Sequence, residues 1–169
     1  WFQLLQLTIG SSAVSLGVLL GTFMGGMCLG SYLLPRILDV RQHPLRVYAM
    51  LELGIGVFGL VLLFGMPLVN SIYTSIVGGH IVVRAVVAAI CLLPPTLMMG
   101  ATLPAVGRWV ETSPKGVSWL GFFYGGNIGG AVLGSLLAGF YLLRVTDMAI
   151  TTYVAVALNV LVAVLGLLI

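Results

Sequence analysis

The chain has 169 residues, of which 60% are hydrophobic and 7% are charged, and its formal net charge is +3. Roughly 25% of the residues of a soluble domain are charged, so this composition excludes a soluble globular fold. The seven basic residues form no run or stripe, which argues against nucleic acid as a partner. A lipid bilayer is therefore the expected surroundings of most of the chain.

Six apolar segments follow one another along the sequence. Residues 1–9 reach only about 14 Å as a helix, too short to cross a hydrocarbon core of about 30 Å, and we expect them to end a preceding helix. The other segments are long enough to span: residues 11–38, 47–69, 80–110, 117–143 and 148–169. Strand-like alternation is absent. The sequence thus predicts an all-α, polytopic transmembrane bundle of five full helices plus a fragment.

The first segment carries glycines at four-residue intervals in two rows. One row is Gly17, Gly21 and Gly25, and the other is Gly26 and Gly30. Small residues at this spacing let two helix backbones approach closely within lipid. We expect these rows to serve in helix packing.

Glu52 is the acidic residue that lies clearly inside an apolar segment, the second one. It follows Arg46 by six residues and so lies about 9 Å deeper along the helix axis. A charge at such depth is costly and by default marks a functional site. The alternative, which we favour, is a structural hydrogen bond to a neighbouring helix, with Tyr124 and Asn127 as natural partners. Glu52, Tyr124 and Asn127 are the candidate binding residues.

The third segment would be about 46 Å long as a straight helix, more than one crossing needs. Three prolines interrupt it: Pro94, Pro95 and Pro104. Because proline lacks the N–H that bonds the carbonyl four residues earlier, we expect a kinked or broken helix. The hydroxyl groups of Thr96 and Thr102 are placed to satisfy freed carbonyls. Transporters use broken helices to coordinate ions, but a merely kinked helix is commoner.

The fourth segment is the richest in small residues at four-residue spacing. They occupy two of its faces, so we expect this helix at the centre of the bundle, packed against other helices rather than forming a substrate path. The glycines expected to pack are Gly125, Gly126, Gly129, Gly130 and Gly134.

The loops differ in charge. Five of the seven basic residues belong to the first and third loops: Arg36, Arg41, Arg46, Arg108 and Lys115. The second loop, at residues 70–79, is uncharged. The positive-inside rule places the basic loops in the cytoplasm. The last helix then runs inward, so a segment after Ile169 would begin in the cytoplasm, and we expect a multi-pass protein of a bacterial inner membrane.

Two stretches resemble the membrane region of bacterial spermidine synthase-like membrane proteins: LPPTLMMGATLPAVGRWV at 93–110 and FFYGGNIGGAVLGSLLAGFYLL at 122–143. Those proteins have a major-facilitator-like segment fused to an aminopropyltransferase-like domain. The resemblance implies a soluble domain of Rossmann-like fold after residue 169. The loop around Asp39 and Arg41 is also similar to a major-facilitator signature, but Pro35 and His43 depart from it.

No stretch of the chain matches a catalytic motif, and we expect neither a cofactor nor a metal ion. The leading hypothesis is a membrane scaffold, anchor or accessory subunit of a spermidine synthase-like protein, bound to other membrane subunits or to its own cytoplasmic domain. One alternative is a secondary transporter module for a polyamine or another cation. Another is the membrane anchor of an active aminopropyltransferase. Whether the whole protein is an enzyme stays open, since that activity would belong to the domain after residue 169.

Overall fold

The computed structural model describes residues 13–37, 42–75, 81–111 and 116–169, and the expected fragment at residues 1–9 lies outside these ranges. The described residues form helices and turns, with no strand among them. The elements are α2 (Ala13–Ile37), α3 (Pro44–Ser75), α4 (Ile81–Glu111), α5 (Gly116–Leu136), the π-helix η1 (Leu137–Leu142), the short α6 (Leu143–Val145) and α7 (Met148–Leu168). The predicted all-α fold is confirmed.

Five of the described helices contain a stretch long and apolar enough to cross a membrane: Ala13–Leu33, Pro44–Val69, Ala89–Glu111, Ser118–Val145 and Met148–Leu168. The chain is therefore a multi-pass membrane protein. Two of the helices differ most from the sequence prediction. Helix α3 continues past residue 69 to Ser75, into the segment expected to be a loop. The fourth crossing changes from α-helix to π-helix at Leu137.

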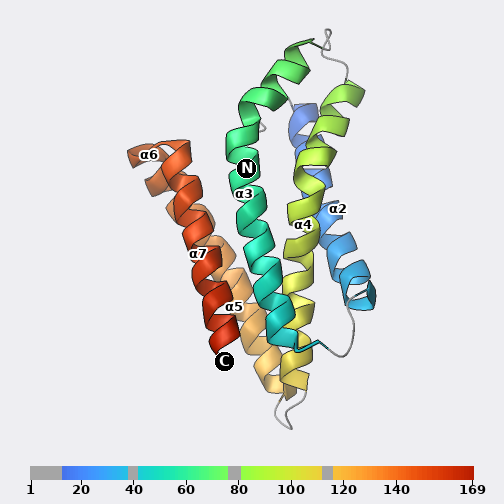
Figure 1. Cartoon of the computed structure of the whole chain (residues 1–169), viewed down its shortest axis with the longest axis vertical. Coiled ribbons are helices and arrows are strands. Elements are labelled where there is room, and N and C mark those ends of the chain that lie inside the picture. The colour runs from blue at the N-terminus through green and yellow to red at the C-terminus, as the bar shows by residue number, and fades with distance from the viewer. Residues whose placement is uncertain (1–12, 38–41, 76–80, 112–115) are drawn as a thin grey trace.

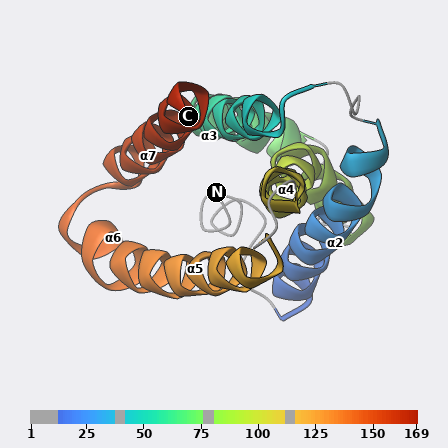
Figure 2. The same cartoon turned by 90° about the horizontal axis from the view of Figure 1, so that it is seen from below.

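Helix α4 holds the bundle together. It packs along both α2 and α3, and α3 in turn packs along α7. The described helices form a ring when seen from below, with α5 on the side opposite α3 (Figure 2). The end of α2, the start of α3, the end of α4 and the C-terminal end of α7 all lie at one end of the bundle (Figure 1). Arg36, Arg46 and Arg108 belong to these helix ends.

The contact between α2 and α4 depends on glycine. A Cβ atom at Gly30 would clash with the carbonyl group of Leu97, and one at Gly100 would clash with the carbonyl group of Met27. The two backbones thus touch directly, which is how helices gain dispersion contacts where lipid removes the hydrophobic driving force. Of the two glycine rows predicted on this helix, the one with Gly30 makes the contact. The other row has nothing near it: Gly17, Gly21 and Gly25.

The prolines do not break α4, which is helical from Ile81 to Glu111 through all three of them: Pro94, Pro95 and Pro104. Of the two expected forms, kinked or broken, the broken one is therefore not observed, and a kink stays a prediction. The Thr96 hydroxyl donates to the carbonyl of Leu92 at 2.7 Å, and the Thr102 hydroxyl donates to that of Met99 at 2.7 Å. Neither of these carbonyls lies four residues before a proline. The two hydroxyl groups therefore do not bond to the carbonyls that the prolines leave free. We infer that packing against α2 and α3 maintains the helix.

The expectation that the fourth crossing is central is also wrong. Its apolar stretch, Ser118–Val145, has no buried residue. A Cβ atom would meet nothing within 4 Å at any of the predicted packing positions: Gly125, Gly126, Gly129, Gly130 and Gly134. Helix α5 approaches α4 near its own start, where the rings of Trp109 and Phe123 meet at 6.3 Å between centroids. These rings act as spacers that keep the two backbones apart. Packing of this glycine set against helices outside the described residues stays a prediction.

Replacing Gly30 by Ala should destabilise the protein, because the added methyl group would meet the Leu97 carbonyl and force the helices apart. Overpacking of this kind costs about 1–3 kcal/mol. The matched control is Gly21→Ala on the same helix, where nothing lies within 4 Å. Thermal unfolding of both variants in one detergent would test this, and equal melting temperatures would contradict the close contact.

Candidate functional site

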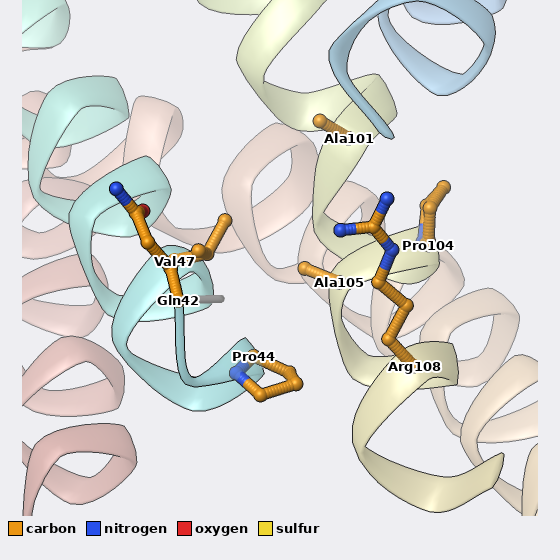
Figure 3. A pocket seen from close by; sticks show the side chains of 7 residues that line it. All are labelled: Gln42, Pro44, Val47, Ala101, Pro104, Ala105 and Arg108. Atoms are coloured by element: carbon orange, nitrogen blue, oxygen red, sulfur yellow. The ribbon is translucent and has the colours of Figure 1, made fainter. Parts of the chain in front are cut away.

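One small cavity lies between the start of α3 and the second half of α4 (Figure 3). It is lined by Gln42, Pro44, Val47, Ala101, Pro104, Ala105 and Arg108. Its volume is about 10 Å³, which is room for about one water molecule. It is too small to hold a substrate, so the candidate site has to be sought elsewhere.

A larger hollow of about 250 Å³ lies where α3, α4 and α5 come together. We call it the Glu52 hollow. It is lined by Tyr48, Glu52, Thr102, Leu103, Val106, Phe122, Phe123, Gly126 and Asn127. The lining combines one carboxyl group, two hydroxyl groups and one amide with apolar and aromatic side chains. Binding sites for small molecules have this composition, in which a few polar groups converge in an apolar pocket.

Helix α3 supplies the carboxyl group and a hydroxyl. Glu52 and Tyr48 are four residues apart, which places them on the same face of the helix. Both side chains are half-buried. The Tyr48 hydroxyl donates a hydrogen bond to the Glu52 carboxyl group. This bond orients the carboxyl group toward the hollow instead of leaving it without a partner in the membrane-spanning part of α3.

Helices α4 and α5 supply the rest of the lining. Thr102 comes from α4, and its hydroxyl is already bonded to the Met99 carbonyl of the same helix. Phe122 and Phe123 come from the start of α5, with their rings 6.2 Å apart in an edge-to-face arrangement. Gly126 lies one turn further on, and its missing side chain leaves space in the hollow that Glu52 also lines.

Two of the three candidate residues from the sequence line this hollow. Glu52 and Asn127 both do, whereas Tyr124 does not, and its side chain is 56% exposed. Within the described part of the chain, the side-chain partner of Glu52 is Tyr48 of its own helix rather than Tyr124 or Asn127. Sequence reasoning missed Tyr48, although its position four residues before Glu52 was a usable signal. A binding role for these residues stays a prediction.

The Glu52 hollow offers a single carboxyl group. In the ranges that the structure describes, no three His, Cys, Asp or Glu side chains come together as a metal ion would need. The other polar groups of the lining are neutral oxygen and nitrogen atoms of tyrosine, threonine and asparagine. The chemistry available here is therefore hydrogen bonding and the attraction of one positive charge.

The fold and this hollow define a multi-pass helical membrane protein with a polar, partly aromatic hollow between three of its described helices. No family model, no curated protein and no solved structure matches the chain. Its function therefore has to be argued from its own residues.

A double-mutant cycle tests the bond between Tyr48 and Glu52. The variants Tyr48→Phe and Glu52→Leu should be non-additive, with a coupling of about 0.5–1.5 kcal/mol, because each removes the same hydrogen bond. The measurement is the free energy of unfolding of both single variants and the double variant in detergent. As a control, Tyr153→Phe on the exposed part of α7 should be additive with Glu52→Leu. Additivity in both cycles would mean that the Tyr48 hydroxyl contributes nothing to holding Glu52.

Proposed function

We propose that the chain is the membrane module of a spermidine synthase-like protein, which acts as a scaffold, anchor or accessory subunit within a larger membrane complex. The observation that carries this proposal is that no residue of the fourth crossing, Ser118–Val145, is buried among the described residues. This crossing bears the same four-residue glycine spacing that joins α2 to α4. A helix with glycine rows and no neighbour on them is suited to packing against another helix in lipid.

The resemblance supports the same proposal. The stretches at 93–110 and 122–143 that carry it correspond to the second half of α4 and to α5 with η1. In the proposed arrangement the partner is another membrane subunit or the protein's own domain after residue 169.

Transport of a polyamine or another cation is the second candidate function. The Glu52 hollow favours it, because a carboxyl group inside a membrane span by default marks an ion or substrate path. Uptake of a labelled polyamine into proteoliposomes, lost in Glu52→Gln while the protein stays folded, would replace the scaffold proposal by this one.

We also propose that the end of the bundle with Arg36, Arg46 and Arg108 faces the cytoplasm of a bacterium. The basic residues at that end support this orientation through the positive-inside rule. The C-terminal end of α7 lies at the same end (Figure 1), so a following domain would be cytoplasmic.

Cysteine labelling tests the orientation. Single cysteines at residues 42 and 147 of a Cys-free variant lie at opposite ends of the described bundle. An impermeant maleimide added to intact cells should label position 147 and leave position 42 unlabelled until the cells are opened. The reverse pattern would contradict the proposed orientation.

Gly130→Leu tests the assembly proposal. Nothing in the described chain lies within 4 Å of a Cβ atom at Gly130, so the variant should fold and melt like the parent. If Gly130 packs against a partner helix, the larger side chain should abolish the complex, because it prevents close backbone approach. Gly65→Leu on α3, which also faces open space, is the matched control.

The measurement is the mass of the complex extracted from native membranes in mild detergent. The parent and the Gly65→Leu control should run as the same assembly, and Gly130→Leu should run smaller. Identical masses for all three proteins would overturn the assembly proposal at this row of glycines.

A further inference from the structure

The Glu52 carboxyl group lies in a membrane span, and among the described residues of the hollow it has no positive partner. No basic side chain is among the residues that line it. The hydroxyl of Tyr48 bonds to the carboxyl group but supplies no charge. An ionised carboxylate at this place is therefore favoured only when a cation occupies the hollow beside it.

The two hydroxyl groups of the hollow offer acceptors rather than donors, and the Asn127 amide offers both an acceptor oxygen and N–H donors. The hydroxyl hydrogen of Tyr48 is used by Glu52, and that of Thr102 is used by the Met99 carbonyl at 2.7 Å. A hydroxyl whose hydrogen is engaged presents only its oxygen lone pairs to a ligand. Together with the carboxylate and the amide oxygen of Asn127, the lining matches a ligand that donates several hydrogen bonds. An ammonium group with its own N–H bonds fits, and an anion does not.

The rest of the lining is aromatic and aliphatic. The Phe123 ring is fixed on two sides, by Trp109 at 6.3 Å and by Phe122 at 6.2 Å between ring centroids. Aromatic faces attract cations, by about 0.5–2 kcal/mol, and Leu103 and Val106 can cover an alkyl chain. The volume of about 250 Å³ is below the range of about 300–1,000 Å³ typical of sites for drug-sized molecules. The ligand is therefore small. One carboxylate balances one positive charge, so the ligand is also monovalent.

We propose that the Glu52 hollow binds a compact primary alkylammonium ion, with the ammonium group at Glu52 and Asn127 and the alkyl chain against Phe123. This assignment does not require the assembly role proposed above. It makes the transport candidate more specific, because it states the charge of the ligand and its need for N–H donors.

The experiment uses the purified chain in nanodiscs of phosphatidylcholine, with n-butylammonium chloride as the probe and isothermal titration calorimetry as the readout. The parent should bind butylammonium saturably, and Glu52→Gln should weaken binding at least tenfold. Glu111→Gln, which removes the exposed carboxyl group at the end of α4, is the control and should bind like the parent. Tetramethylammonium, which has the same charge but no N–H, should bind at least tenfold more weakly than butylammonium.

Two further variants keep the proposal testable if Glu52→Gln does not fold. Gly126→Leu adds a side chain to the hollow at a position where nothing lies within 4 Å of a Cβ atom, so it should abolish butylammonium binding while the melting temperature stays unchanged. Gly130→Leu, one turn away and outside the lining, should bind normally whether or not it assembles. Asn127→Asp adds a second carboxylate, and it should shift the preference at least tenfold from butylammonium toward the dication of 1,4-diaminobutane.

Three results would overturn the proposal. They are the absence of butylammonium binding by the parent, equal binding by Gly126→Leu, and equal affinity for tetramethylammonium. A parent that prefers the diammonium ion over butylammonium would contradict the match of one carboxylate to one charge. If butylammonium binds but no assembly forms, the assembly proposal fails and this one stands. If the assembly forms but butylammonium does not bind, this proposal fails and the assembly proposal stands.

Discussion

The close contact between the backbones of α2 and α4 is the constraint on which the rest of the described structure depends. Lipid surrounds both helices, so exclusion of water cannot drive them together, and dispersion between closely spaced backbones has to do so. The absent side chains at Gly30 and Gly100 make that approach sterically allowed. Once α4 is fixed against α2, its other face is free for α3, and α3 in turn carries α7.

The Glu52 hollow depends on the contact that α4 makes with α5. There large side chains make the contact: the ring of Trp109 of α4 meets that of Phe123 of α5, and Leu120 of α5 lies against Gly107 of α4. Rings hold two helix backbones further apart than glycines do, so space remains next to the contact. The polar groups of α3 and α4 border that space. One chain thus uses both modes of helix contact, and the looser one produces the site.

The sequence was sufficient for the fold class because composition alone excludes water as the main solvent. It was not sufficient for the placement of α5. A row of small residues such as Gly126 and Gly130 permits close packing but does not name the partner, since the facing helix must present a complementary surface. The row with Gly30 packs against such a surface at Gly100. The rows of α5 contact no such surface within the described residues. The prolines likewise left the form of α4 open between kinked and broken, and the described helix continues through Pro94 and Pro95 while it packs on two neighbours.

Only the part of the candidate site that lies on a single helix could be predicted from the sequence, because spacing along one helix is known in advance and the crossing of two helices is not. Glu52 could be identified from its depth in an apolar segment, and Tyr48 follows from a spacing of four residues along the same helix. Thr102 and Phe123 could not be placed beside Glu52, since they depend on how α4 and α5 cross α3. Helix α5 contributes Gly126 and Asn127 to the hollow and carries Gly130, which is open to other helices, one turn further on. A partner that packed on Gly130 would therefore press on the same helix that forms one wall of the ligand site.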